Sequence, residues 1–543
     1  MVRLLFVWAV LYLAIRVHGQ QGFISIDCGM ANNDSIYIDD PYHLTYVSDA
    51  QFIDTGVSEN VRIFRNDLVR LYRTVRSFPN GNKLGPVNKS NKYLIRAHFM
   101  YGDYDGKNST PEFKLYIGAN FWSTISFSDA TDAFNVEIII VATMNFISVC
   151  LVNTDYGIPF ISGLELRPLT NSMYGVVNES QSIQVFYIRY DVGLSISNDV
   201  ISFPDDPFDL YWSPIEKADW ISFGTSQNVT NKDGAIEPLS MVMMTAVRPI
   251  NDSAALHYSW TADDLTQQFL LYMHFAELEQ LGYNITREFT VCYGNNSCNG
   301  SETLRPGYLL TTTIQTVQPL SGQYNYSCSF KKTPNSNRPP ILNAIEVFTI
   351  VPFTAIPTRE QDVEAMFDVK ATYKVERNWM GDPCEPEIYS WVGLTCDNSN
   401  TLSDAPAIVS LNLSSFGLKG EIAASIANLK FIQSLDLSWN NLTGPIPDFL
   451  GDLPSLSLLN LSGNQLSGLV PTILLEKSKK GSLKLSVDNN PDLCVSDSCG
   501  GHSNKRNITV LVVAPVASVV ILLFLLIILW RFKWRKQGKH SIA

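Results

Sequence analysis

The sequence predicts a mainly β protein in which tandem β-sandwiches precede a short α/β solenoid of repeats and a single transmembrane helix. Short apolar runs between turn-forming clusters indicate the sandwiches, leucines that recur every 24 residues indicate the solenoid, and an uncharged run at 508–530 indicates the membrane helix. The hydrophobic share of 45% and charged share of 17% are typical of folded domains rather than a disordered stalk. A formal charge of −12 disfavours nucleic acid as a partner.

Residues 1–19 have the features of a secretory signal peptide. Arg3 precedes a short apolar run, and Val17 and Gly19 stand at the small-residue positions before a cleavage at Gln20. The run is too short to span a bilayer. We therefore expect the chain to enter the secretory pathway, where cysteines oxidise.

Residues 23–350 carry the strand pattern of antiparallel β-sandwiches. Apolar or alternating runs lie at 92–99, 113–117, 136–142, 146–152, 269–275 and 344–350, and Gly, Asn, Asp and Pro separate them. The region is too long for one sandwich of about 100 residues. The polar stretch at 171–182 is expected to divide it into two sandwiches.

A 24-residue repeat occupies 408–499. Four columns keep the same phase: Leu411, Leu435 and Leu459; Leu413, Leu437 and Leu461; Leu418, Leu442 and Leu466; Gly420, Gly444 and Gly468. With Asn440 and Asn464 they resemble the plant form of the leucine-rich repeat, in which each unit lays a short strand on the concave side and the Asn side chain bonds unpaired backbone at the turn. Phe416 replaces that Asn in the first unit. A weaker fourth unit contains Leu483, Leu485 and Asn489.

Nine cysteines in a secreted chain predict disulfides and at least one leftover thiol. We expect one disulfide between Cys384 and Cys396 and another between Cys494 and Cys499, because each pair is close in sequence and stands where an end of the solenoid needs a cap. Zinc binding is the alternative, but no His lies near either pair. The pairing of the other cysteines stays open: Cys28, Cys150, Cys292, Cys298 and Cys328.

The run at 508–530 is long enough to cross a hydrocarbon core of about 30 Å as a helix. The basic cluster that begins at Arg531 marks the cytoplasmic side. We therefore expect a single-pass type I protein of the plasma membrane, with its N-terminus outside the cell. Residues 531–543 would form a cytoplasmic tail, which is too short for a catalytic domain.

Sequons for N-glycosylation are frequent along the chain. The candidate acceptors are Asn33, Asn88, Asn108, Asn178, Asn228, Asn251, Asn284, Asn295, Asn299, Asn325, Asn412, Asn441 and Asn460. Asn507 also matches, but it adjoins the membrane run. Asn412 and Asn460 fall on outward strand positions, so glycans there would mask part of the concave face. Alternatively, the repeat consensus creates these two sequons by coincidence.

Several longer strings invite comparison with a known family. They are Phe-Ile-Ser-Ile-Asp-Cys-Gly from Phe23, Tyr-Leu-Ile-Arg-Ala from Tyr93, Tyr-Gly-Asp-Tyr-Asp-Gly from Tyr101, Pro-Phe-Ile-Ser-Gly-Leu-Glu-Leu-Arg-Pro-Leu from Pro159, Pro-Asp-Asp-Pro-Phe-Asp from Pro204, Met-His-Phe-Ala-Glu-Leu from Met273 and Pro-Pro-Ile-Leu-Asn-Ala-Ile-Glu from Pro339. These strings resemble the plant malectin-like domain. The segment 360–400, a linker and N-terminal cap with Gly-Asp-Pro-Cys from Gly381, resembles the junction in malectin-like, leucine-rich-repeat receptor kinases of plants. The resemblance implies tandem malectin-like β-sandwiches at 23–350.

The chain departs from this family pattern in two places. No Gly-rich loop, His-Arg-Asp or Asp-Phe-Gly motif follows the membrane run, so we expect a receptor-like protein without the kinase domain and without enzyme activity. Asn82, Lys83 and Leu84 stand where the family commonly shows Arg-Asn-Cys-Tyr. The missing cysteine would account for the odd total.

The resemblance to malectin implies a carbohydrate site in the loop that contains Tyr101, Asp103, Tyr104 and Asp105, where rings would stack on sugars and carboxylates would bind hydroxyls. An ordinary β-turn with exposed tyrosines and a strand-capping Asp is the alternative. Peptide recognition at the cleft between the sandwiches competes with sugar binding. No catalytic, metal or cofactor site is expected, because none of the usual motifs is present.

Three functions fit these features. The first is a plasma-membrane receptor-like protein that recognises an extracellular glycan or peptide and signals through a partner receptor kinase or co-receptor. The second is a tether to cell-wall polysaccharide. The third is a decoy, or a truncated form of a malectin-like leucine-rich-repeat receptor kinase, that titrates ligand.

Overall fold

The computed structural model describes residues 22–30, 36–40, 42–53, 56–78, 87–193, 199–231, 238–294, 300–375, 379, 381–397 and 405–495. The chain divides into two compact units between Val409 and Ser410. Within the described residues, no helix is long and apolar enough to cross a membrane. The predicted signal peptide, membrane helix and cytoplasmic tail lie outside these residues, as do Cys298, Cys499 and the sequons at Asn33, Asn295 and Asn299.

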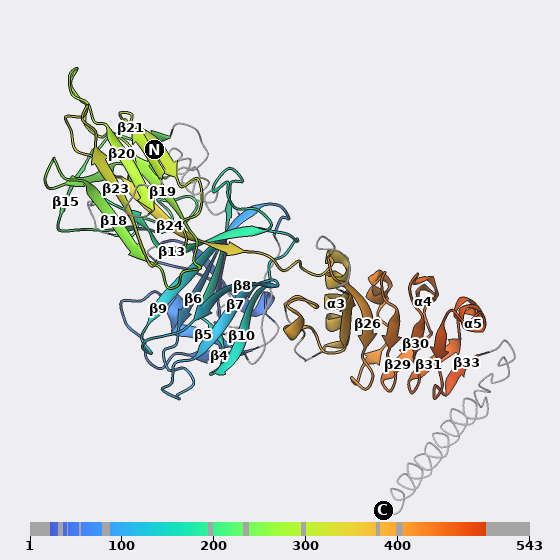
Figure 1. Ribbon diagram of the computed structural model, residues 1–543. Coiled ribbons are helices and arrows are strands. Elements are labelled where there is room, and N and C mark those ends of the chain that lie inside the picture. Colours follow the sequence, from blue (N-terminus) through green and yellow to red (C-terminus); the bar gives the residue numbers. More distant parts are fainter. Residues whose placement is uncertain are drawn as a thin grey trace, which may run out of the picture. The chain divides into compact units, whose positions relative to one another are not determined.

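One long sheet runs through both sandwiches of the first unit (Figure 1). Its strands, in spatial order, are β16 (Thr230–Asn231), β22 (Leu310–Gln315), β19 (Phe269–Phe275), β24 (Ala344–Pro352), β13 (Gln181–Asp191), β9 (Ala133–Val141), β6 (Lys92–Met100), β12 (Gly163–Leu169), β1 (Ile24–Asp27), β3 (Thr45–Ser48) and β2 (Ile36–Ile38), with β14 (Trp212–Pro214) beside β13. Strands β13 and β24 belong to the second half of the region, whereas β9 and β6 belong to the first. The two predicted sandwiches therefore share a sheet. The predicted dividing stretch, 171–182, contains most of the connection between β12 and β13 and the first two residues of β13.

The first sandwich is completed by two smaller sheets. One contains β10 (Val149–Tyr156), β7 (Glu112–Ile117) and β8 (Asn120–Ile125). The other contains β11 (Phe160–Ile161), β5 (Thr74–Ser77) and β4 (Val57–Asn60). The 3₁₀ turns η1 (Asp49–Gln51) and η2 (Arg70–Arg73) belong to the same half of the chain. Alternate residues of β6, such as Ile95 and Phe99, enter this core, and the ring of Phe99 packs against Phe113 and Phe160. These residues share one face because successive side chains of a strand point to opposite faces of the sheet, as the alternating pattern predicts.

The second sandwich repeats this arrangement. Its smaller sheets contain β18 (Leu256–Thr261), β23 (Asn325–Lys332), β20 (Phe289–Gly294) and β21 (Gly300–Leu304), and β15 (Trp220–Gly224) and β17 (Thr245–Pro249), with α2 (Ser240–Met243) before β17. Aromatic residues fill its core. Trp260 stacks on Tyr326 with ring centroids 5.5 Å apart, and Phe275 packs against Phe289 and Phe330.

The opposite face of the long sheet carries a buried ladder of charges across the junction. Arg96 on β6 is fully buried and donates from Nε to Glu137 on β9 (2.6 Å) and from Nη1 to Glu165 on β12 (2.6 Å). Arg189 on β13 donates from Nη1 to the second oxygen of Glu137 (2.6 Å) and from Nε to Glu346 on β24 (3.1 Å). Glu137 therefore bridges two arginines that come from different sandwiches. We call these five residues the charge ladder.

Neighbouring side chains stabilise the ionised carboxylates of the charge ladder. Burial alone would raise the pKa of Glu137, but Arg96 and Arg189 outweigh it and hold that pKa below its ordinary value. Glu165 behaves in the same way, and its pKa lies well below the usual range because burial is opposed by Arg167, His98 and Arg96. Buried charges that lack a partner are costly, so each member depends on the next.

The loop after Pro204 closes the ladder. Asp209 is fully buried, and its carboxylate accepts from Arg96 (2.9 Å) and from Arg167 (2.7 Å), while its carbonyl accepts a second bond from Arg96. The guanidinium of Arg96 also lies over the ring of Tyr211, 3.4 Å from its centroid. Asp206 in the same loop accepts from the indole of Trp212 (3.1 Å). The family-like Pro-Asp-Asp-Pro-Phe-Asp string is thus part of the junction.

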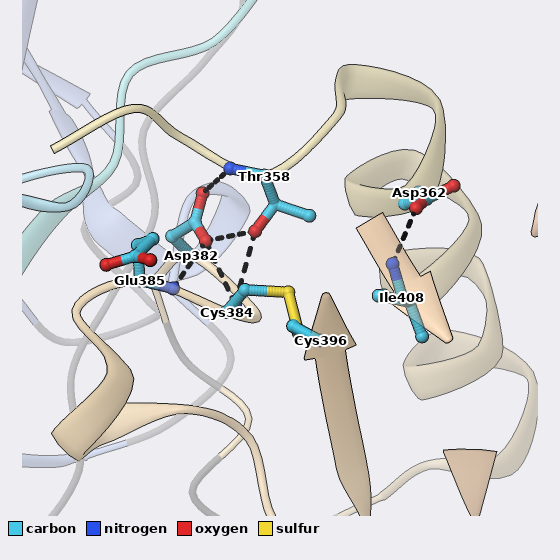
Figure 2. The surroundings of a disulfide bond; sticks show 7 residues. All are labelled: Thr358, Asp362, Asp382, Cys384, Glu385, Cys396 and Ile408. Carbon is cyan, nitrogen blue, oxygen red and sulfur yellow. Dashed lines mark hydrogen bonds between the residues drawn. A yellow bond between two sulfur atoms is a disulfide. The ribbon is translucent and has the colours of Figure 1, made fainter. Parts of the chain in front are cut away.

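A compact cap follows the sandwiches and contains α3 (Glu360–Tyr373), the 3₁₀ turn η3 (Glu387–Tyr389) and β25 (Leu394–Asp397). Figure 2 shows the disulfide between Cys384 and Cys396, the pairing predicted from their spacing, with Cα atoms 5.9 Å apart. The buried carboxylate of Asp382 accepts from the backbone N–H groups of Thr358 (2.9 Å), Cys384 (3.0 Å) and Glu385 (2.9 Å). The Asp of Gly-Asp-Pro-Cys therefore fixes the loop that carries the disulfide.

The cap is docked on the first sandwich. The side-chain amide of Asn120 pairs with the backbone of Ala355 in both directions, at 3.1 and 2.9 Å. Lys89 forms an ion pair with Glu360 (2.8 Å). Gly381 has a positive φ of 67°, and a Cβ there would lie 2.8 Å from the sulfur of Cys150, so only glycine fits this approach.

The second unit is a solenoid of parallel strands. One ladder contains β26 (Ala407–Asn412), β28 (Ser434–Asp436), β30 (Leu458–Asn460) and β32 (Lys484–Ser486), and a second contains β27 (Lys419–Gly420), β29 (Asn441–Gly444), β31 (Gln465–Leu469) and β33 (Asp492–Cys494), with η4 (Ala424–Asn428), α4 (Phe449–Asp452) and α5 (Thr472–Lys479) between them. The leucines of the predicted columns are buried. Leu411 faces Leu435, which faces Leu459, as their spacing predicts.

The asparagines form the predicted polar ladder. Asn440 accepts from Leu418 N (3.0 Å) and donates to Leu413 O (2.8 Å), and Asn464 makes the equivalent bonds one repeat later. In the fourth unit the prediction of Asn489 is wrong, because Asn490 fills this position and accepts from Leu466 N (3.0 Å). Leu485 pairs with Leu459, so the third unit is two residues longer than 24 and the columns of the fourth unit are shifted.

We expect Glu137→Gln to lower the free energy of unfolding by roughly 3–5 kcal/mol, because it leaves Arg96 and Arg189 without their shared carboxylate. Chemical denaturation monitored by circular dichroism measures this change. Glu302→Gln, which removes an exposed carboxylate on β21, is the matched control and should change stability by less than about 0.5 kcal/mol. Equal effects of the two substitutions would contradict the role of the ladder.

Replacing Cys384 and Cys396 together with serine should lower the free energy of unfolding of the cap by about 2–4 kcal/mol, since the disulfide restricts the unfolded chain. Thermal unfolding measures the loss. Peptide mapping without reductant should recover the linked pair. Recovery of both cysteines as free thiols would contradict the assignment.

Asp191 makes stability depend on pH. Burial raises its pKa from 3.8 to about 7, although its carboxylate accepts from Thr245 Oγ1 (2.8 Å). The folded state therefore binds a proton that the unfolded state releases, so stability falls as the pH rises from about 4 towards 7. We expect Asp191→Asn to reduce the loss of stability between pH 5 and pH 8 by roughly 1–3 kcal/mol. Identical pH profiles of the two proteins in denaturant titrations would refute this expectation.

Candidate functional site

Three connections meet at one end of the first sandwich. They are the β6–β7 connection at 101–111, the β8–β9 connection at 126–132 and the β10–β11 connection at 157–159. Gly102 N donates to Ala130 O (2.8 Å), and the hydroxyl of Tyr104 donates to Ile158 O (3.1 Å). Loops that are held at the end of a rigid sandwich are common ligand sites. We call these connections the loop end.

The two tyrosines of the predicted carbohydrate site lie in the core of the loop end. Tyr101 is 0% exposed and Tyr104 is 4% exposed. Their rings meet edge to face at 5.6 Å, and Tyr104 packs on Phe160 at 5.2 Å. Burial raises the pKa of both phenols. Neither the sugar-stacking prediction nor the exposed-turn alternative anticipates this burial, because both require the rings at the surface.

The two carboxylates of the predicted site hold the turn together. Asp105 accepts from the Tyr101 hydroxyl (2.6 Å) and from Lys107 N (3.2 Å), and Asp103 accepts from Asn108 N (2.8 Å). Burial would raise the pKa of Asp105, but the bond from Tyr101 and the nearby Lys107 lower it overall. The four residues thus form one hydrogen-bonded turn, and their role in carbohydrate binding stays a prediction.

An exposed aromatic residue that the sequence did not single out lies at the same loop end. Tyr156, the last residue of β10, is 70% exposed and borders a recess of about 390 Å³. The recess is lined by Thr110, Pro111, Glu112, Ser126, Phe127 and Tyr156. Thr154 Oγ1 donates to Glu112 O (2.6 Å) and fixes the strand register beside the recess. The residues that line this recess thus include an exposed tyrosine, a glutamate, a serine and a threonine.

A second hollow lies between the first sandwich and the cap. Its volume is about 70 Å³, and Asn120, Met144, Pro357 and Asp382 contribute to its lining. This volume is well below the roughly 300–1,000 Å³ of typical small-molecule sites. The recess beside Tyr156 is therefore the better candidate.

The described residues hold no group of three or more His, Cys, Asp or Glu side chains that could bind a metal ion. Cys28, Cys150 and Cys328 are buried in the first unit, and Cys494 is half-buried in the second. Cys292 is disulfide-bonded. The predicted partner of Cys494, Cys499, lies outside the described residues, so that pairing stays a prediction.

Two known protein families match parts of this chain. The model of the malectin-like domain matches residues 26–350, and the leucine-rich-repeat model matches 431–453 and 455–476. The chain belongs to the malectin-like family.

Its relatives among curated proteins are leucine-rich-repeat receptor-like kinases of Arabidopsis thaliana. One leucine-rich repeat receptor-like serine/threonine-protein kinase is 42% identical over 544 residues, which cover 98% of this chain and 61% of that protein. The LRR receptor-like serine/threonine-protein kinase IOS1 is 42% identical over 516 residues, which cover 93% of this chain and 56% of that protein. The chain thus spans about three fifths of the length of these relatives.

Solved structures show the same fold for the sandwich region. The ANX2 ectodomain from Arabidopsis thaliana has a TM-score of 0.51 and 17% identity, covering 60% of this chain and 96% of that one. The plant receptor-like kinase FER has a TM-score of 0.50 and 18% identity, with the same coverage. At this identity the likeness establishes the fold alone.

Proposed function

We propose that this chain is a plasma-membrane receptor-like protein that recognises an extracellular glycan or peptide and signals through a partner receptor kinase. The observation that carries the proposal is the Tyr156 recess, an open ligand-sized hollow at the loop end of a malectin-like sandwich. The receptor-like kinases among the relatives support a role in signalling.

The chemistry of the recess favours a glycan over a peptide. The exposed ring of Tyr156 offers an apolar face to the C–H groups of a pyranose, and Glu112, Thr110 and Ser126 offer acceptors and donors to its hydroxyls. Pro111 packs under Gly157, since a Cβ there would lie 2.6 Å from the proline ring, so the strand ends are held close. A preformed site limits the entropy that is lost on binding.

The sequon at Asn108 lies in the same connection and complicates any test. Asn108 is exposed with a positive φ of 50°, two residues before Thr110. A glycan on Asn108 would compete for the recess with an external sugar. Binding is therefore best measured in the Asn108→Gln protein as well as in the original chain.

We expect Tyr156→Ala in the Asn108→Gln protein to weaken glycan binding about tenfold or more, because the stacking face is lost. Glycan arrays identify the sugar, and titration calorimetry measures the affinity. Tyr283→Ala is the control, since Tyr283 is fully exposed but lies in the second sandwich. Retention of full affinity by the Tyr156 variant would reject the recess as the binding site.

A separate experiment tests whether signalling requires a partner kinase. Co-purification from membranes before and after addition of ligand identifies the partner, and replacement of 508–530 by an unrelated apolar run distinguishes pairing of membrane segments from pairing of ectodomains. A normal cellular response after removal of every candidate kinase would favour the polysaccharide tether. Dominant inhibition of a full-length relative would favour the decoy.

A further inference from the structure

Trp439 occupies an unusual backbone conformation in the solenoid. The residue after each strand turn is left-handed: Ser415 (φ 59°), Trp439 (φ 56°), Gly463 (φ 69°) and Asn489 (φ 57°). Gly and Asn tolerate this region, whereas for a bulky side chain it is a genuine outlier. The second repeat therefore keeps a tryptophan at a position that disfavours one, and strain of this kind commonly marks a functional residue.

The indole of Trp439 has one covered face and one open side. A Cβ on Gly463 would lie 2.6 Å from Cε3 of the indole, so the ring rests on the glycine of the next repeat. The residue is nevertheless 62% exposed. The bond from Trp439 N to Ser462 O (2.8 Å) holds the turn in place. The ring is thus a fixed, solvent-facing platform.

A glycosylation sequon begins two residues after this platform. Asn441, Leu442 and Thr443 form the sequon, and Asn441 is exposed at the start of β29. Between the two exposed residues, Asn440 points inward, where it accepts from Leu418 N and donates to Leu437 O. Two residues span at most about 7 Å, so the first sugar on Asn441 can reach the ring.

We propose that the first N-acetylglucosamine of a glycan on Asn441 packs on the open face of Trp439. The sugar ring presents C–H groups to the negative face of the indole, and the contact removes apolar surface from water. This contact helps to offset the strain of the left-handed tryptophan. It also covers the flank of the second repeat with carbohydrate, so a protein partner has to dock elsewhere on the solenoid.

The neighbouring repeats supply internal controls. Asn412 and Asn460 also begin sequons, but Ser410 and Leu458 precede them by two residues, and the left-handed positions of those repeats hold Ser415 and Gly463. Neither has an aromatic platform at the equivalent place. The proposal therefore applies to Asn441 and not to these two sites, and it does not depend on the ligand of the first sandwich.

Hydroxyl-radical footprinting with mass spectrometry tests the contact on the full chain purified with its glycans. The oxidation rate of Trp439 should rise several-fold in Asn441→Gln and stay unchanged in Asn412→Gln. An unchanged rate in Asn441→Gln, or an Asn441 that carries no glycan, would overturn the proposal. Protection of Trp439 that appears only when membrane proteins are added would also overturn it, in favour of a protein partner.

Thermal unfolding of a double-mutant cycle gives an independent readout. Trp439→Ser introduces the residue of the first repeat, so the fold of the turn is expected to persist. Loss of the glycan through Asn441→Gln should lower the melting temperature of the solenoid when Trp439 is present and leave it unchanged in the Trp439→Ser protein. The same decrease in both backgrounds would show that ring and glycan are not coupled and would contradict the proposal.

Discussion

The buried charge ladder joins the two sandwiches of this protein. Strands β9 and β13 share a register of only two residue pairs, Ile139 with Ile183 and Ile138 with Gln184. Beyond these pairs Glu137 continues the link, because its two oxygens bind arginines from opposite sides of the junction at 2.6 Å each. Separating the sandwiches would leave buried charges without partners, and that penalty is what makes the junction specific. One apolar core contains residues from both halves, including Leu94, Ile139, Ile183 and Phe348.

Part of this architecture is readable from the sequence. Alternating apolar runs predict the strands, and the 24-residue period predicts the solenoid and its asparagine ladder, because each pattern is local. The charge ladder is not readable in this way. Arg96 lies within an apolar run, and its partner Asp209 stands 113 residues away, so the pairing depends on the strand order of the whole sheet. The length of the third repeat, which contains α5 and is two residues longer than 24, could not be predicted either.

The candidate site shows the same limit. Proximity in sequence correctly groups Tyr101, Asp103, Tyr104 and Asp105 in one turn, but it does not reveal which way a ring faces. Both rings turn into the core, where Phe160 packs against them. Tyr156 is the last residue of β10 and precedes Gly157. Its position at the surface could not be predicted from the sequence, because it depends on the pairing of β7 with β10.

Hydrogen exchange measured by mass spectrometry under native conditions tests the central claim most directly. If the charge ladder makes the two sandwiches one cooperative unit, the slowest amides of β6 and β9 should have the same free energy of opening as those of β13 and β24. Glu137→Gln should then lower this free energy equally in all four strands. Distinct free energies for the two pairs of strands, with Glu137→Gln affecting only β6 and β9, would contradict the account.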